Sequence, residues 1–67
     1  MDINLVLSKL IAKYQTERWF KGVRVGRKDG IDYFEMFSSR KLMSYETPKE
    51  FMGFQISIIV EQHVTIS

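Results

Sequence analysis

The stretch GVRVGRKDGIDYFEMF (residues 22–37) decides the fold, because it predicts a β-hairpin whose register can be read from the sequence. Asp29 and Gly30 at its centre are a strong signal for a two-residue type I′ turn, in which both residues have positive φ. With this turn as the loop, the predicted cross-strand pairs are Lys28 with Ile31, Arg27 with Asp32, Gly26 with Tyr33, Val25 with Phe34, Arg24 with Glu35, Val23 with Met36 and Gly22 with Phe37. A slip of one residue would move the apolar side chains to the opposite face, so the pattern favours this register.

The two faces of the predicted hairpin differ in chemistry. One face is apolar and carries Val23, Val25, Phe34 and Met36. On the other face, Arg24 lies opposite Glu35 as an oppositely charged cross-strand pair. Tyr33 and Phe37 share this second face, and each lies across from a glycine, where an aromatic ring can cover exposed backbone.

An amphipathic helix is predicted before the hairpin. Apolar residues recur at the spacing of one helical face, and they are Ile3, Val6, Leu7, Leu10, Ile11 and Tyr14. Asp2 is a suitable N-cap, and the helix is expected to end at about residues 16–18. We expect Trp19 to anchor this helix to the sheet.

The second half of the chain predicts a short helical turn and a strand. Thr47, Pro48 and Glu50 have the spacing of a capping box with proline at the first helical position, which predicts a helical turn near residues 48–52. Apolar and polar residues then alternate, which favours a strand over about residues 54–66. The predicted fold is therefore α+β. An N-terminal amphipathic helix packs on a small antiparallel β-sheet made of the hairpin (about 19–27 and 31–38) and the C-terminal strand, in a single domain over residues 1–67.

Composition excludes several classes of protein. The chain has 67 residues, a net charge of +2, no cysteine and one histidine, His63. It therefore lacks the ligands of a thiolate or histidine-cluster metal site, and no metal, cofactor or catalytic residue is predicted. No apolar run approaches the ~20 residues of a spanning helix, so we expect a cytoplasmic protein, of the kind that phage and other viral genomes encode, with no membrane partner. A domain this short buries only about 60% of its unfolded surface, and a homodimer or another partner is expected to supplement its stability.

Positive charge is concentrated in one segment. Residues 9–28 contain seven basic residues and one acidic residue, whereas the rest of the chain is mildly acidic. Aromatic rings stack on bases and cations bind phosphates, so this segment and the polar face of the hairpin predict binding of DNA or RNA. The candidate nucleic-acid-binding residues are Lys21, Arg24, Arg27, Lys28, Tyr33 and Phe37. Phe20 is expected on the same face.

Two alternatives to nucleic-acid binding remain. The charges can form a solvated helix face and a salt-bridged hairpin, while the aromatic residues pack against another segment or another subunit. The chain can also be a protein-binding inhibitor or modulator, such as a small phage protein that acts on a host or defence enzyme through a strand edge or the aromatic face.

Overall fold

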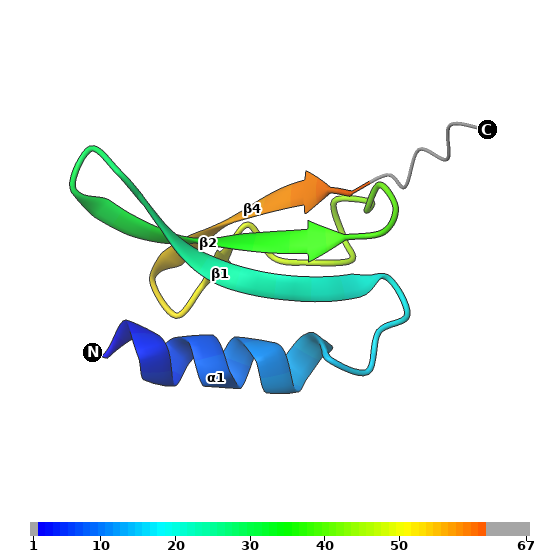
Figure 1. The fold of residues 1–67 in the computed structure, drawn as a ribbon, viewed down its shortest axis with the longest axis horizontal. Helices are drawn as coiled ribbons and strands as arrows, with labels where there is room; N and C mark the ends of the chain where they lie inside the picture. Colours follow the sequence, from blue (N-terminus) through cyan, green and yellow to red (C-terminus); the bar gives the residue numbers. More distant parts are fainter. Residues whose placement is uncertain (1, 62–67) are drawn as a thin grey trace.

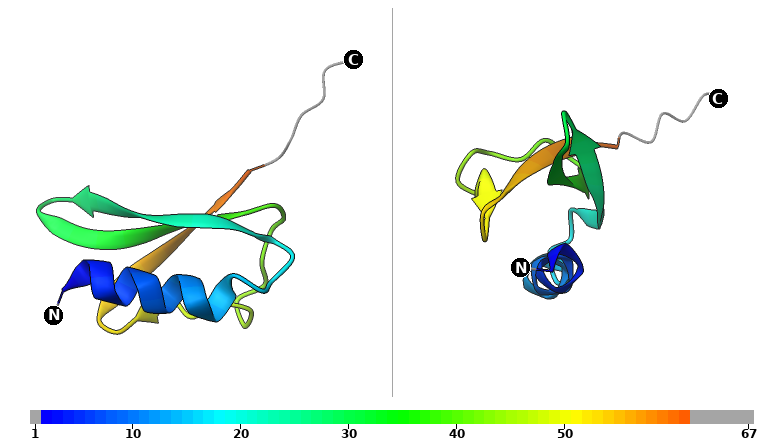
Figure 2. Two further views of the ribbon diagram at one scale, coloured as in Figure 1. Left: turned by 60° about the horizontal axis from the view of Figure 1, so that its bottom comes forward. Right: turned by 90° about the vertical axis from the view of Figure 1, so that its left-hand side faces the viewer.

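The computed structural model describes residues 2–61, in which one helix precedes four strands (Figure 1). The elements are α1 (Ile3–Tyr14), β1 (Phe20–Lys28), β2 (Ile31–Ser38), β3 (Glu50–Phe51) and β4 (Phe54–Val60). The strands form one sheet in the order β1-β2-β4-β3, and α1 lies across one face of it (Figure 2). The α+β class with an N-terminal helix packed on a small sheet is confirmed.

The helix α1 begins where the sequence predicts. The side chain of Asp2 accepts a hydrogen bond from the backbone N–H of Asn4 at 3.0 Å, which satisfies one of the free donors of the first turn. Val6, Leu10 and Tyr14 are buried on the face toward the sheet. The helix ends at Tyr14, slightly earlier than predicted.

The β1–β2 hairpin has the predicted register at every pair from Lys28 with Ile31 to Gly22 with Phe37. Asp29 and Gly30 have φ of 53° and 75°, so both turn residues have the positive φ that a type I′ turn requires. The turn and the alternation of side chains therefore determine this part of the fold locally.

A β-bulge at the start of β1 corrects one prediction. Phe20 pairs with Ser38 and Gly22 pairs with Phe37, so Lys21 is the extra residue of the bulge. Gly22 has a φ of 142°, a conformation that favours glycine. The bulge reverses the alternation, so Phe20 packs against the core rather than lying on the face of Tyr33 and Phe37.

The C-terminal strand is the main departure from the predicted sheet. β4 pairs with β2 in parallel, from Phe34 with Ile56 to Ser38 with Val60, so the sheet is mixed rather than antiparallel. Residues 39–53 are long enough to return the chain to the hairpin-turn end of the sheet before β4 begins, as a parallel pair requires. Residues 62–66 of the predicted strand lie outside the described residues.

The predicted helical turn near residues 48–52 is also wrong. Glu50 and Phe51 form the short strand β3, which pairs with Gln55 and Phe54 of β4. Met52 and Gly53 form the turn between them, with φ of 50° and 89°. A single helical turn gains few hydrogen bonds for the residues that it orders, whereas the strand packs Phe51 against the core.

The core lies between α1 and the sheet. It contains Val6, Leu10, Tyr14, Trp19, Phe34 and Met36, all of them buried. The rings of Tyr14 and Trp19 lie 5.8 Å apart, centroid to centroid, so Trp19 joins the helix to the sheet as predicted. Burial, and to a lesser degree the charge of Glu17, raises the pKa of Tyr14 above its ordinary value.

An ion pair and a backbone hydrogen bond hold together the loop that connects β2 to β3. The guanidinium of Arg40 donates two hydrogen bonds to the carboxylate of Glu46, at 3.0 and 2.5 Å. The same carboxylate accepts the backbone N–H of Met43 at 2.7 Å. The hydrogen bond from Arg40, followed by that from Met43, lowers the pKa of Glu46 from its ordinary 4.5 to about 2.

Candidate functional site

The face of the sheet opposite α1 holds most of the predicted site residues. Among residues 2–61, no helix covers this face, which we call the open face (Figure 2). Its side chains follow from the alternation along β1, β2 and β4 and are those of Arg24, Lys28, Ile31, Tyr33, Glu35, Phe37, Gln55, Ser57 and Ile59. Arg24, Lys28, Tyr33 and Phe37 therefore share one surface.

Tyr33 lies directly over the backbone of Gly26. A Cβ atom built on Gly26 would lie 2.7 Å from the ring carbon Cζ and 2.9 Å from the hydroxyl oxygen of Tyr33. The predicted cover of this glycine by an aromatic ring is confirmed. Because one side of the ring packs on β1, its orientation is set by the fold, and the half-buried ring forms part of the open face.

Phe37 has a different environment, although it also pairs with a glycine. No atom lies within 4 Å of a Cβ built on Gly22, so the Phe37 ring does not cover that residue. The guanidinium of Arg24 instead lies 5.3 Å from the centroid of the Phe37 ring, within the range of a cation–π contact. Phe37 therefore has a cation over its ring, which Tyr33 does not have among the described contacts.

The charge of Arg24 is compensated within the face. Its Nε donates a hydrogen bond to Oε1 of Glu35 at 2.8 Å, which confirms the predicted cross-strand pair. This hydrogen bond, and then the charge of Glu35, raises the pKa of Arg24 above its ordinary value. Because Arg24 is held by Glu35 and lies over Phe37, it is less free to bind a phosphate than the sequence predicts.

The two remaining predicted cations lie elsewhere. Arg27 is on the same face of the hairpin as Val25, toward α1, and its Nε lies 3.5 Å from a carboxylate oxygen of Asp32. Lys21 is exposed within the bulge. Of the basic candidates, the structure therefore brings only Arg24 and Lys28 together with the aromatic residues on the open face.

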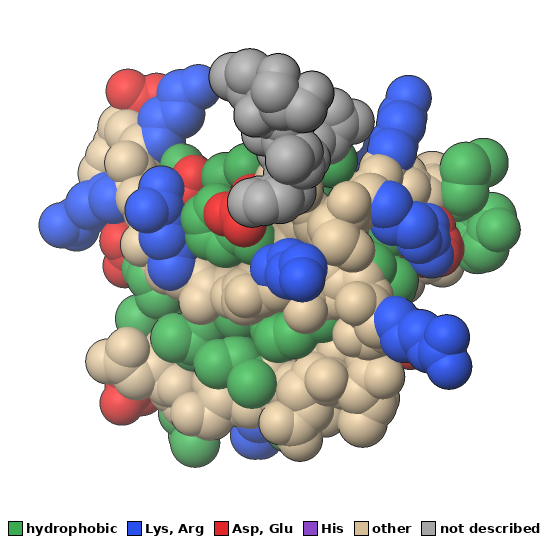
Figure 3. All heavy atoms as spheres, turned by 45° about the vertical axis from the view of Figure 1, so that its right-hand side comes forward, with side chains coloured by type: hydrophobic (Ala, Val, Ile, Leu, Met, Phe, Trp, Pro, Cys, Tyr) green, Lys and Arg blue, Asp and Glu red, His purple; other side chains and the backbone are tan. Residues whose placement is uncertain are grey.

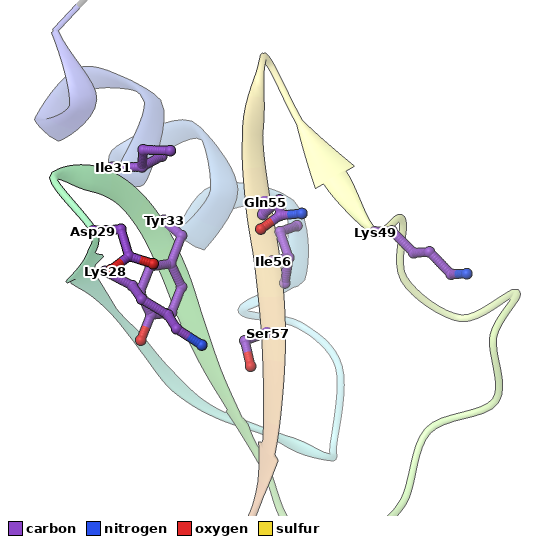
Figure 4. Close-up of a pocket in the computed structure, with 8 residues that line it drawn as sticks. All are labelled: Lys28, Asp29, Ile31, Tyr33, Lys49, Gln55, Ile56 and Ser57. Carbon is purple, nitrogen blue, oxygen red and sulfur yellow. The ribbon is translucent and has the colours of Figure 1, made fainter.

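A cleft opens beside Tyr33, between the hairpin and β4. The parallel pairing of β2 with β4 begins at Phe34 and Ile56, and the two strands diverge before that point (Figure 4). The cleft has a volume of about 570 Å³. Its lining residues are Lys28, Asp29, Ile31, Tyr33, Lys49, Gln55, Ile56 and Ser57. Tyr33 and Lys28 thus belong both to the open face and to a concave site.

The close-up shows how the polar groups of the cleft are arranged. Lys28 extends past Tyr33 toward β4, where Ser57 and Gln55 lie on the opposite side (Figure 4). Lys49 belongs to the rim beyond β4, and its side chain extends away from the hairpin (Figure 4). An aromatic ring and an ammonium on one side of a cleft, with a hydroxyl and an amide on the other side, can bind a planar ring that carries an anionic group.

Sequence reasoning missed Lys49, Gln55 and Ser57, because they join the site only through the parallel pairing of β4 with β2. In the space-filling view, Lys and Arg side chains project at separate points of the surface, with hydrophobic side chains exposed between them (Figure 3). A binding argument therefore depends on the cleft with Tyr33 and Lys28 rather than on one continuous basic patch.

Within residues 2–61, no group of His, Cys, Asp and Glu side chains is arranged to hold a metal ion. None of the described helices has the length and apolar character needed to cross a membrane. No family model, curated protein or solved structure matches this chain.

Proposed function

We propose that this protein is a non-catalytic nucleic-acid-binding domain that binds a single strand of DNA or RNA on the open face. The observation that carries the proposal is the fixed ring of Tyr33 in the cleft, with the ammonium of Lys28 beside it. The ring supplies a surface on which a base can stack, and Lys28 supplies a cation for a neighbouring phosphate.

Stacking favours Tyr33 over the other aromatic candidate. Its contact with Gly26 fixes the ring before a ligand arrives, so little side-chain entropy is lost on binding. A base on an aromatic ring contributes about 1 to 3 kcal/mol. Phe37 already has the guanidinium of Arg24 over its ring, and a base would have to displace it. We therefore assign the main stacking role to Tyr33.

The charges at the cleft suit a flexible strand. Lys28 extends along the cleft beside Tyr33, whereas Lys49 lies on the rim with its side chain directed away from the hairpin, so Lys28 is the cation placed to contact a phosphate (Figure 4). Asp29, on the hairpin turn, repels phosphates at that end. A single strand can place an unpaired base in a cleft of this size, whereas the bases of a duplex are stacked and paired.

Fluorescence anisotropy with labelled oligo-dT and oligo-U, between about 50 and 200 mM salt, tests this proposal. We expect Tyr33→Leu to weaken binding about tenfold, as the loss of one stacked base predicts, while Tyr33→Phe retains most of the affinity. We expect Lys28→Gln to reduce the slope of log K against log salt by about one.

The matched control is Lys9→Gln, which makes the same charge change on an exposed position of α1, away from the open face. Its affinity and salt slope should stay close to those of the wild type. If Lys9→Gln and Lys28→Gln weaken binding equally, or if neither oligonucleotide binds, the proposal is wrong. Circular dichroism of each variant checks that the fold is retained.

A further inference from the structure

The outer edge of β1 is a second exposed feature of the sheet. β1 (Phe20–Lys28) is the terminal strand in the order β1-β2-β4-β3, and no described strand pairs with its other side. At nine residues it is also the longest strand within the described part of the chain. A long edge strand presents a row of backbone N–H and C=O groups that can pair with another extended chain.

The hairpin geometry identifies which backbone groups face outward. In a two-residue hairpin loop the flanking residues, Lys28 and Ile31, exchange both of their hydrogen bonds, and the pattern then alternates along the antiparallel pair. Gly26 and Arg24 therefore bond to β2. The N–H and C=O groups of Val23, Val25 and Arg27 point to the free edge.

The side chains of β1 indicate the chemistry of a partner strand. Residues 20–28 contain four cations and no acidic residue. On the open-face side, Arg24 keeps 66% of its side chain exposed although Glu35 holds its Nε, and Lys28 is exposed near the turn, so both cations can attract a carboxylate placed beside β1. On the face toward α1, Val23 and Val25 are only partly buried.

We propose that the β1 edge binds an extended acidic segment of another protein, in which acidic and apolar residues alternate. Its backbone pairs with Val23, Val25 and Arg27. Its acidic side chains lie beside Arg24 and Lys28 on the open-face side, and its apolar side chains extend the apolar surface of Val23 and Val25. This surface shares Lys28 with the cleft, but the outward backbone groups of Val23, Val25 and Arg27 are not part of the cleft lining, and their pairing does not depend on nucleic-acid binding.

Charge argues against a second copy of this chain as the occupant. If β1 of one copy paired with β1 of a second copy, the cations of both strands would lie next to each other and repel. Basic edge strands are in fact protected from self-association in this way. An acidic strand removes the repulsion and replaces it with attraction.

The test uses a capped, labelled peptide of the same length as β1, in which Glu and Val alternate. The key variants are Arg27→Pro and Arg27→Ala, which lose the same charge, while only the proline also removes an outward N–H donor. We expect Arg27→Pro to bind the peptide about tenfold more weakly than Arg27→Ala, as the loss of one well-formed hydrogen bond predicts. Circular dichroism checks that both variants are folded.

Hydrogen exchange locates the bound peptide. We expect slower exchange of the amides of Val23, Val25 and Arg27, and loss of binding when the peptide is N-methylated on its pairing edge or carries Lys in place of Glu. Equal affinity of the two Arg27 variants, or protection confined to the cleft, would overturn the proposal. Protection of the same amides by self-association without peptide would overturn it in favour of a homodimer. Oligonucleotide binding by the Arg27→Pro variant is measured as well. If this variant still binds oligonucleotides but not the peptide, the peptide result concerns the β1 edge and not the proposed nucleic-acid function.

Discussion

The two faces of β2 carry alternate residues of one strand and have opposite properties. Phe34 and Met36 point toward α1 and have no exposed surface, whereas Tyr33 and Phe37 point to the open face and are half-buried. The rings of Phe34 and Phe54 lie 5.5 Å apart in an edge-to-face arrangement on the covered side. On the open face, Tyr33 contacts Gly26 of β1, and Phe37 contacts Arg24 of β1.

This contrast teaches that burial, not residue type, separates the aromatic residues that form the core from those for which we propose a binding role. The covered face gains its stability from apolar area removed from water. The open face keeps its aromatic rings partly accessible and holds them in place by local contacts. One strand therefore stabilises the core with the residues of one face and keeps rings accessible, for the binding that we propose, on the other.

The largest expected effect comes from the same substitution on the two faces. Phe34→Ala should lower the free energy of unfolding by about 3–5 kcal/mol, because it leaves a cavity in the core. Phe37→Ala should cost about 1 kcal/mol, since the ring is only partly buried. Urea unfolding followed by circular dichroism measures both. Where Phe34→Ala does not fold, Phe34→Leu provides a milder cavity, and equal losses at positions 34 and 37 would contradict the comparison.

A smaller effect is expected where Tyr33 covers Gly26. In Gly26→Ala the new Cβ would collide with the end of the Tyr33 ring, which must swing away. We expect a loss of about 1 kcal/mol in the free energy of unfolding, together with weaker oligonucleotide binding. The loss should nearly disappear when Gly26→Ala is made in a Tyr33→Leu background. An unchanged cost in that background would show that the ring does not depend on this glycine.

The smallest effect concerns the connection, which belongs to neither face. Because the folded pKa of Glu46 is lowered to about 2 from its ordinary 4.5, its ionised form stabilises the fold above about pH 4.5. That contribution is lost as pH falls toward 2, so the free energy of unfolding should decrease over this range. The free energy of unfolding of the Glu46→Gln variant should decrease less over the same range, because position 46 then has no carboxylate to protonate.

Glu50→Gln is the control for this titration, since it removes the same charge away from Arg40. The effect is small because the ion pair lies at the surface, where water screens the charges. Urea unfolding at a series of pH values measures it. If wild type and Glu46→Gln lose stability in parallel between pH 4.5 and 2, the contact between Arg40 and Glu46 does not contribute.

The hairpin and the helix could be predicted because their determinants are local. The Asp29–Gly30 turn and the alternation of side chains are sufficient to set the register, which in turn places Arg24, Lys28, Tyr33 and Phe37 on one face. The glycine at position 22 was the signal for the bulge, since glycine within a strand often marks one. A prediction that treats Gly22 as a regular strand residue contains no bulge, and it therefore places Phe20 on the wrong face of the hairpin.

The position of β4 could not be predicted in the same way. Alternation over residues 54–60 identifies a strand but not its neighbour or its direction, because these depend on the path of the long connection. The Thr47, Pro48 and Glu50 pattern is a genuine local signal for a helix start, and pairing of β3 with β4 overrides it. The cleft was missed for the same reason, since Gln55 and Ser57 meet Tyr33 only through this non-local pairing.

The parallel pairing of β2 with β4 also sets an order for the folding reaction. Phe34 pairs with Val25 across a tight turn, but it meets Ile56 only after the whole connection has closed. Contacts that are distant in sequence form late, because loop-closure entropy must be lost first. On the ribosome, the helix and hairpin emerge before their last strand, with part of the core still open. The nascent chain therefore passes through a stage in which Phe34 and Met36 are incompletely covered, and this stage ends when β4 pairs with β2.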